Sequence, residues 1–294
     1  MSIPDYRETF AIKHDSASGA TAPKYEQILK WWLRNEHGIS LPMSAKPWAG
    51  ICVQHGVDLS LGLADYDKDA GQQQPLEIAQ ATKLMLEKYD GYEPRSWDGG
   101  KDAEEFEAFR EHLPEMLANG KAAVEKAFTF ANMMEGEYQI WHKEPKIDVP
   151  IMIFQDYSGG NTQADLKCSL PVRNPVKKDG TRTWRVPKPK TEPTKQQIMQ
   201  QAVYWKATGQ DPSLLFVTAA GYHVADQFNT PALQEENLEL AYQEVVMSWQ
   251  ITQNLLKAAN GSWRTLAGLV QPDFEEIRAR HGDEILTLAK NLWS

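Results

Sequence analysis

The chain has 294 residues, with 31 Lys and Arg against 40 Asp and Glu, which gives a formal net charge of −9. Hydrophobic residues make up 41% and charged residues 24%, which is ordinary for a soluble globular protein and excludes a wholly disordered chain. No apolar run approaches the ~18–20 residues of a membrane helix, and the first residues lack the pattern of a signal peptide. Two cysteines exclude a disulfide framework and a four-cysteine zinc or iron–sulfur site held by this chain. We therefore expect a soluble, cytoplasmic protein with no membrane partner.

The N-terminal part is expected to be mainly helical. Residues 1–22 are polar and predict a flexible arm. From about Pro23 to Gly38 the apolar residues recur at the spacing of one helix face, and the glycine is placed to end that helix. The pattern at 42–63 leaves the conformation open. Further helices are expected near 76–89, 102–118 and 119–134, so the mainly helical part spans 23–135.

From Glu137 onward the pattern changes to strands. Three strands are expected at 137–143, 149–157 and 162–169, and the Ser-Gly-Gly-Asn between the last two is typical of a hairpin turn. A helix with a capping box from about Thr194, a strand at 213–222 and a long helix from Thr230 to Gly261 are expected to follow. This order predicts an α/β fold in a single domain that spans 23–294. Within this domain, the α/β core is expected at 136–225 and the C-terminal helices at 226–294.

The hairpin is expected to bring three ionisable side chains together. Asp165 and Lys167 are two residues apart in a strand, so they share one face of it. With the turn centred between its two glycines, Asp165 lies opposite Phe154, which places Asp156 diagonally across at roughly 7–8 Å. Because a slip by one residue would separate the two carboxylates, this prediction depends on the register.

Two carboxylates and a lysine at one place can carry out hydrolysis. Hard oxygen ligands favour Mg²⁺ or Mn²⁺, and such an ion activates water and neutralises the charge that develops on a phosphodiester. The lysine would orient that water, help to deprotonate it, or stabilise the pentavalent phosphate. The competing interpretation is an exposed strand face on which Asp and Lys are merely solvated.

The helix after the hairpin adds two polar candidates. Gln200 and Tyr204 are four residues apart and therefore lie on one helix face. The buried stripe of this helix is expected to consist of Ile198, Ala202 and Trp205, which leaves the two polar residues along the border of the sheet. A polar helix with a boundary tyrosine is the alternative.

A basic segment lies between these motifs. Residues 167–195 contain nine Lys or Arg and two acidic residues, a local charge of +7 in an acidic chain. Such a segment, with a tryptophan in its middle, is typical of contacts to a phosphate backbone, and a solvated loop is the alternative. The candidate DNA-binding residues are Arg173, Lys177, Lys178, Arg182, Trp184 and Arg185.

Three segments within 137–222 together resemble the PD-(D/E)xK nuclease superfamily, and specifically its RecB-like and lambda-exonuclease-like branch. In chain order, these segments are VPIMIFQDY, ADLKCS and QQAVYW. The resemblance implies a restriction-endonuclease-like core, a mixed sheet flanked by helices, with a helical N-terminal extension. It also implies that Asp156 and Asp165 ligate Mg²⁺, or Mn²⁺ in its place, with the Leu166 carbonyl as a third ligand. Lys167 would be the catalytic lysine. Gln200 and Tyr204 would support the site and contact DNA.

The sequence departs from that branch at the upstream histidine. Many RecB-like nucleases carry a further metal ligand in a Gly-x-x-His pattern, which His55 and Asp58 do not match. These two residues and Glu137 remain open as further ligands. Relatives that hold an iron–sulfur cluster need four cysteines, so we expect no iron–sulfur cluster here.

The resemblance implies a Mg²⁺-dependent DNA exonuclease that acts from duplex ends in phage or bacterial recombination and repair, in the host cytoplasm if a phage encodes it. A single-strand annealing protein would be its partner, and a homo-oligomer its assembly. The alternatives are an endonuclease of a restriction or defence system and a non-catalytic DNA-binding protein that keeps the fold. A hydrolase of small phosphate esters is a third alternative, which would leave the basic segment unexplained.

Overall fold

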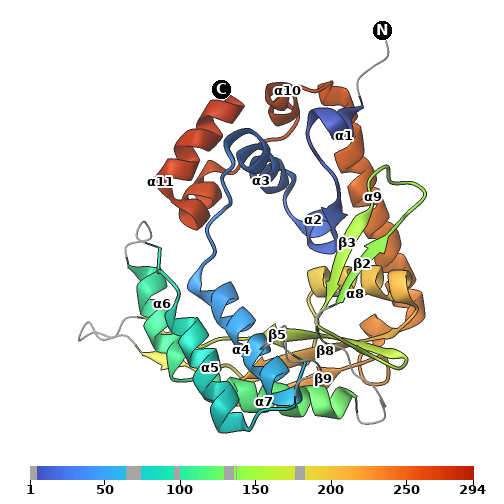
Figure 1. Ribbon diagram of the computed structural model, residues 1–294. Coiled ribbons are helices and arrows are strands. Elements are labelled where there is room, and N and C mark those ends of the chain that lie inside the picture. Colours follow the sequence, from blue (N-terminus) through green and yellow to red (C-terminus); the bar gives the residue numbers. More distant parts are fainter. Residues whose placement is uncertain (1–4, 64–73, 96–99, 129–135, 137, 176–182) are drawn as a thin grey trace.

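A computed structural model describes residues 5–63, 74–95, 100–128, 136, 138–175 and 183–294 (Figure 1). Glu137 and the basic residues Lys177, Lys178 and Arg182 therefore lie outside the described residues. Within the described part, no helix combines the length and the apolar character that a membrane span requires. The chain is a mixed α/β protein in which helices precede, separate and follow small sheets.

The N-terminal residues pack against the rest of the protein, where the sequence predicted a flexible arm. They form short elements and contribute Phe10, which is fully buried, together with Ala17 and Ala20. Phe10 packs edge-on against Trp263, so an aromatic contact from the C-terminal helices holds the first turn in place. The elements are α1 (Tyr6–Thr9), β1 (Asp15–Ser16) and α2 (Ala17–Thr21).

Five helices follow, and most of them were predicted. The predicted helix that ends at Gly38 is confirmed, and this glycine closes it with a positive φ of 65°. The segment whose conformation was open forms a buried helix, α4, in which small residues allow close packing. One predicted boundary was wrong, because the chain breaks at His112, which precedes the second of two helices. The helices are α3 (Lys24–His37), α4 (Ala45–Leu61), α5 (Ile78–Asp90), α6 (Lys101–Arg110) and α7 (Leu113–Ala127).

Two sheets meet where the chain passes Asp156. The first has the order β1-β3-β2, and the second has the order β4-β5-β8-β9. β5 runs parallel to β8, as expected when a helix connects them, and β8 and β9 form a hairpin. A separate ribbon joins β6 and β7. The strands are β2 (Tyr138–His142), β3 (Ile151–Gln155), β4 (Tyr157–Gly159), β5 (Thr162–Cys168), β6 (Val172–Arg173), β7 (Trp184–Arg185), β8 (Asp211–Thr218) and β9 (Gly221–Ala225).

The predicted hairpin register was wrong by two residues. Tyr157 pairs with Ala164, and Phe154 pairs with Gln139 of β2 instead of with Asp165. The single strand predicted at 149–157 is therefore divided between two sheets. Because a shift of two residues preserves the face on which each side chain points, Asp156 now lies level with Asp165 at the end of the hairpin.

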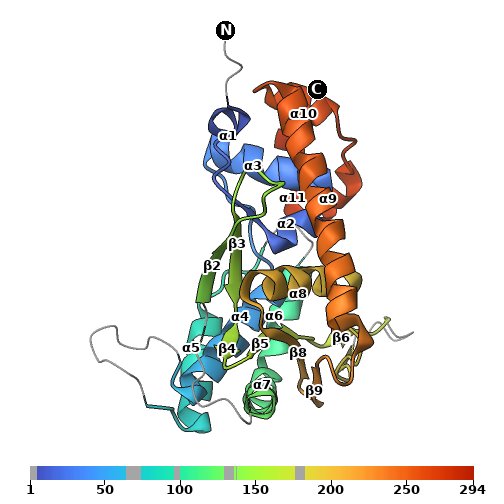
Figure 2. The same ribbon diagram turned by 90° about the vertical axis from the view of Figure 1, so that its right-hand side faces the viewer.

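Helices cover both faces of the four-stranded sheet (Figures 1 and 2). Leu166 and Leu215 face α4 and α7, whereas Leu214 and Phe216 face α8 and α9. The predicted capping box is confirmed: Thr194 and Gln197 bond reciprocally at the start of α8. The remaining helices are α8 (Lys195–Thr208), η1 (Pro231–Leu233), α9 (Glu235–Ala259), α10 (Trp263–Gly268) and α11 (Phe274–Trp293).

Candidate active site

Asp156 and Asp165 come together where β3 passes into β4. The Asp156 Oδ2 atom accepts a hydrogen bond of 2.7 Å from the backbone N–H of Leu166, which fixes it against β5. Asp165 is only 4% exposed. Burial, and then the neighbouring Asp165, raise the pKa of the Asp156 carboxyl well above its usual range. A pair of carboxylates in this position repel each other and favour a cation between them.

Lys167 lies beside this pair on the same strand. Its Nζ forms an ion pair with Asp165 and donates a hydrogen bond of 3.1 Å to Gln200 Oε1. Burial disfavours the ammonium charge, but Asp165 and Asp156 outweigh it and raise the pKa of Lys167. The lysine therefore remains protonated over the physiological pH range. Among the described residues, two acceptors take up two of its three N–H donors, which leaves one for a ligand.

α8 supplies an amide network that holds the lysine. Gln200 Nε2 donates to the hydroxyl of Tyr204 at 2.6 Å, so the predicted pair joins the site through Lys167. Burial and Asp165 raise the pKa of Tyr204, which keeps its hydroxyl neutral. The predicted helix stripe was partly wrong, because Ile198 and Trp205 are only half-buried.

Sequence reasoning missed Gln201, which is fully buried. Its Nε2 donates to Asp165 Oδ2 at 3.2 Å, so it helps to position that carboxylate. The sequence did contain a sign of this role. Gln201 lies three residues after Ile198 and four before Trp205, so it is a polar residue within the predicted apolar stripe.

A second buried amide pair lies on the same face of β5. Gln155, the last residue of β3, donates through its side chain to Gln163, and both residues are 1% exposed. Gln163 precedes Asp165 by two residues, so its side chain points to the same side of β5. The two sheets are thus joined by hydrogen bonds next to the carboxylates, which restricts how far Asp156 can move.

Asp58 and His55, two further candidate metal ligands, do not join the two carboxylates in a metal-binding group. Asp58 lies near the buried Tyr157, whose pKa is raised first by burial and then by this carboxylate. His55 is half-buried on α4, the helix that also carries Asp58, and its pKa is lowered by burial and by Lys88. Leu166 buries its side chain in the core, and its main chain adjoins the pair because its N–H donates to Asp156. Within the described residues, no group of three or more His, Cys, Asp or Glu side chains is arranged to hold a metal ion.

Two of the candidate DNA-binding residues in the basic segment make contacts with other residues of the protein. Arg173 forms an ion pair with Glu104 and lies over the ring of Trp184, 5.6 Å from its centre. Trp184 in turn packs edge-on against Phe109, so it is part of the structure of the β6–β7 ribbon. Arg185 is exposed, and its contact with DNA stays a prediction.

A cavity of about 500 Å³ opens beside Lys167. Three further lysines line it: Lys46 from the start of α4, and Lys188 and Lys190 from the chain before α8. No acidic residue is among the described residues that line it, although Lys46 also contacts Glu105 at 3.5 Å. Lysines from distant parts of the sequence thus converge next to the buried carboxylates, and Lys46 is one that sequence reasoning missed.

The site therefore joins a carboxylate pair, a protonated lysine and a basic cavity. In comparisons with known proteins, no family model, no curated protein and no solved structure matches this chain.

Proposed function

We propose that this protein is a Mg²⁺-dependent deoxyribonuclease that hydrolyses phosphodiester bonds, with an exonuclease acting from duplex ends as the leading form. The observation that carries the proposal is the convergence of Asp156, Asp165 and Lys167 beside the lysine-lined cavity. The proposal includes a restriction-endonuclease-like core. It is supported by the mixed sheet with helices on both faces, in which β5 carries Asp165 and Lys167.

The residues present fit a magnesium ion. Mg²⁺ usually binds through one or two carboxylates and keeps its other positions for water and substrate phosphates. Asp156 and Asp165 would provide those carboxylates, with the carbonyl of Leu166 as the third protein ligand. The raised pKa of Asp156 supports this assignment, because a cation would relieve the repulsion that contributes to it. When bound, the ion would activate water and neutralise charge on the phosphate.

Lys167 would stabilise the charge that develops on the phosphate. Since its pKa is raised, it supplies a fixed positive charge and an N–H donor, and it is poorly suited to accept a proton. Gln200 restricts the direction of the ammonium group, and Tyr204 restricts Gln200 in turn. This arrangement holds a donor in place before substrate arrives, which is the kind of preorganisation that lowers a reaction barrier.

The lysine cavity would hold the DNA backbone. Lys188 and Lys190 are exposed and form no ion pair with another described residue, so they can release counterions on binding phosphates. DNA affinity should therefore fall steeply with salt. Duplex DNA is the proposed partner, in phage or bacterial recombination and repair in the cytoplasm. A single-strand annealing protein and further copies of this chain are proposed from the resemblance alone.

A gel assay tests this function. The same plasmid is supplied supercoiled or linearised and incubated with Mg²⁺ or with EDTA, using the wild-type protein and Lys167→Ala. We expect linear DNA to be degraded with Mg²⁺, while the circle survives and Lys167→Ala is inactive. As a matched control, Lys206→Ala removes a lysine from the same helix as Gln200 but outside the site, where it pairs with Glu239. This control should cleave like the wild type.

Other results of the plasmid assay would indicate different functions. Nicked or linearised circles would replace the exonuclease with an endonuclease of a restriction or defence system. Salt-dependent binding without cleavage in Mg²⁺ or Mn²⁺ would replace the enzyme with a non-catalytic DNA-binding protein. Cleavage that persists in EDTA would contradict the metal-dependent mechanism.

A further inference from the structure

The outer face of the β1-β3-β2 sheet carries exposed aromatic rings. Its inner face packs Ile140, Ile151 and Ile153 against α8 and α9. On the outer face, Trp141 is 53% exposed and Phe154 is 40% exposed. Single exposed aromatic residues are common, but adjoining ones that form a continuous patch mark sites of ligand or partner binding.

The rings lie close to one another across neighbouring strands. Trp141 pairs with Met152, and Gln139 pairs with Phe154, so the two aromatic residues occupy diagonal positions on one face. Diagonal neighbours lie roughly 7–8 Å apart, which aromatic side chains can span. His14, which immediately precedes β1, packs edge-on against Trp141 with ring centres 5.7 Å apart. β2, β3 and the residue before β1 thus contribute to one aromatic surface.

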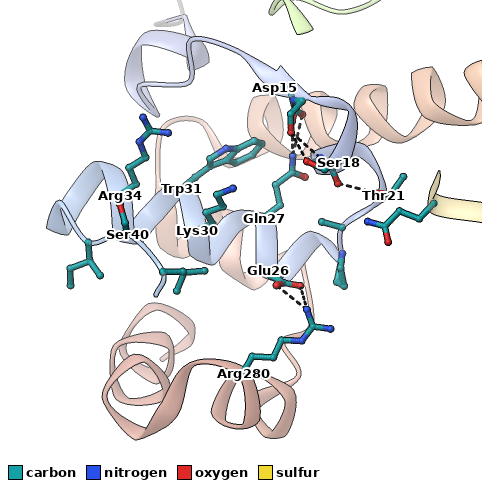
Figure 3. Close-up of a pocket in the computed structure, with 17 residues that line it drawn as sticks. Asp15, Ser18, Thr21, Glu26, Gln27, Lys30, Trp31, Arg34, Ser40 and Arg280 are labelled. Atoms are coloured by element: carbon teal, nitrogen blue, oxygen red, sulfur yellow. Dashed lines mark hydrogen bonds and ion pairs between the residues drawn. The ribbon is translucent and has the colours of Figure 1, made fainter. Parts of the chain in front are cut away.

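Three basic residues lie near this aromatic surface. Lys143 is exposed and follows Trp141 by two residues. Lys30 and Arg34 lie close enough to His14 to lower its pKa, after burial as the main cause. Both belong to α3 and line a cavity of about 600 Å³, together with Trp31 (Figure 3). None of these three cations forms an ion pair with another described residue.

One residue of the aromatic surface lies close along the chain to the candidate active site. Phe154 precedes Asp156 by two residues along the same segment of chain. At ~3.3 Å per residue, their backbones are about 7 Å apart. A strand whose base lies on Phe154 would therefore have a phosphate within reach of the carboxylate pair.

We propose that Trp141 and Phe154, with His14 behind them, bind an extended single strand of DNA next to the site of cleavage. The bases would stack on the two rings, while the phosphates would lie toward Lys143, Lys30 and Arg34. The inference rests on the proposed nuclease function for its choice of DNA as the ligand. Exposed rings select a single strand, because the base faces of a duplex are already stacked on one another.

Binding measured in EDTA tests the inference without cleavage. Fluorescence anisotropy of labelled oligothymidine and of a duplex of equal length would be compared for the wild type, Trp141→Ala and Phe154→Ala. We expect each variant to bind oligothymidine about tenfold more weakly, as stacking contacts usually contribute, and to bind the duplex within about twofold. Phe228→Ala is the matched control, because that ring is 89% exposed and lies on the loop after β9. It should bind both DNAs like the wild type.

Two further arms identify stacking as the cause. Trp141→Phe keeps an aromatic ring and should restore most of the affinity, whereas Trp141→Leu keeps only apolar area and should not. An abasic oligonucleotide has the same charge but no bases, so wild type and Trp141→Ala should bind it equally. Unchanged oligothymidine binding by both alanine variants, or an equal loss on abasic DNA, would overturn the inference.

These results separate the inference from the proposed function. If the plasmid assay shows Mg²⁺-dependent cleavage but both alanine variants bind oligothymidine normally, the nuclease proposal stands and the stacking surface is rejected. If wild type cleaves no DNA but loses single-strand affinity through Trp141→Ala, the stacking surface stands and the nuclease proposal fails.

Discussion

Two buried aspartates in this protein share a glutamine and a lysine as neighbours but differ in the other groups near them. Asp165 on β5 is 4% exposed and accepts from Gln201 Nε2 at 3.2 Å. Asp15 on β1 is 8% exposed and accepts from Gln27 Nε2 at 3.2 and 3.1 Å. Each also has a lysine nearby: Lys167 forms an ion pair with Asp165, and Lys24 lies near Asp15. A buried aspartate with a glutamine amide and a lysine is therefore not enough to indicate catalysis.

The difference lies in the second carboxylate, since Asp15 also lines a cavity with basic residues, namely Lys30, Arg34 and Arg280. Asp165 has Asp156 beside it, and its partner Lys167 lines the lysine cavity. Asp15 accepts instead from the backbone N–H of Ser16 at 2.7 Å, and the backbone of Gly19 packs closely against it. We interpret Asp15 as a structural residue that organises the start of α2, and Asp165 as a ligand for a cation.

The largest expected effect is on cleavage, and it separates the two aspartates. Asp165→Asn removes a charge from the proposed metal site, so we expect cleavage of linear DNA to slow by at least 10²–10³-fold, the order of effect seen when one transition-state contact is lost. Asp15→Asn makes the same chemical change outside the site and should cleave within about twofold of wild type. Equal losses in the two variants, with both proteins folded by circular dichroism, would remove the distinction.

A substitution at Gly19 tests how tightly the structural aspartate is enclosed. A Cβ built on this glycine would overlap Asp15 Oδ1, so Gly19→Ala must displace a buried, hydrogen-bonded carboxylate. We expect the free energy of unfolding to fall by about 1–3 kcal/mol, measured by urea denaturation. Gly268→Ala is the control, since nothing lies within 4 Å of its Cβ, and it should be neutral or slightly stabilising. An equal response of the two variants would show that the region around Asp15 is loosely packed.

The residues of the candidate site differ in how far sequence could predict them. The face shared by Asp165 and Lys167 follows from strand periodicity, and it survived a register error because the error was an even number of residues. Gln200 and Tyr204 follow from helix periodicity in the same way. Periodicity is a local property, so local patterns suffice for these residues.

Other features depend on contacts that local patterns do not contain. The division of the predicted strand at Asp156 depends on which strands compete for pairing with β3, which is a tertiary outcome. α4 was left open because small residues are buried along much of its length, which weakens the amphipathic pattern. Lys46 joins the basic cavity only because α4 packs beside β5, about 120 residues away along the chain.

A smaller effect concerns stability with and without metal. Asp156→Asn removes the repulsion within the carboxylate pair while an amide oxygen can still accept from the Leu166 N–H, so unfolding in EDTA should require about 1 kcal/mol more than for wild type. Wild type should gain about 1.4 kcal/mol at a Mg²⁺ concentration ten times its Kd, whereas Asp156→Asn should gain much less. The measurement is thermal unfolding in EDTA and in Mg²⁺, with Asp15→Asn as a control that keeps the full response to metal. If Asp156→Asn responded to Mg²⁺ as wild type does, Asp156 would not be a ligand.

The smallest expected effect is the pH dependence that Asp15 contributes to stability. Burial raises the pKa of this carboxyl above its unfolded value of 3.8, against the opposing effects of the Ser16 N–H, Lys24 and Gln27. Between the two pKa values the folded protein binds more protons than the unfolded chain, so this residue's contribution to the free energy of unfolding decreases as pH rises through that window. Asp15→Asn cannot titrate, and its stability relative to wild type should therefore be greater at pH 7.5 than at pH 4. Urea unfolding at both pH values measures the difference, which cancels the titration of all other groups. A relative stability that falls with pH would mean that hydrogen bonds to the ionised Asp15 outweigh its burial.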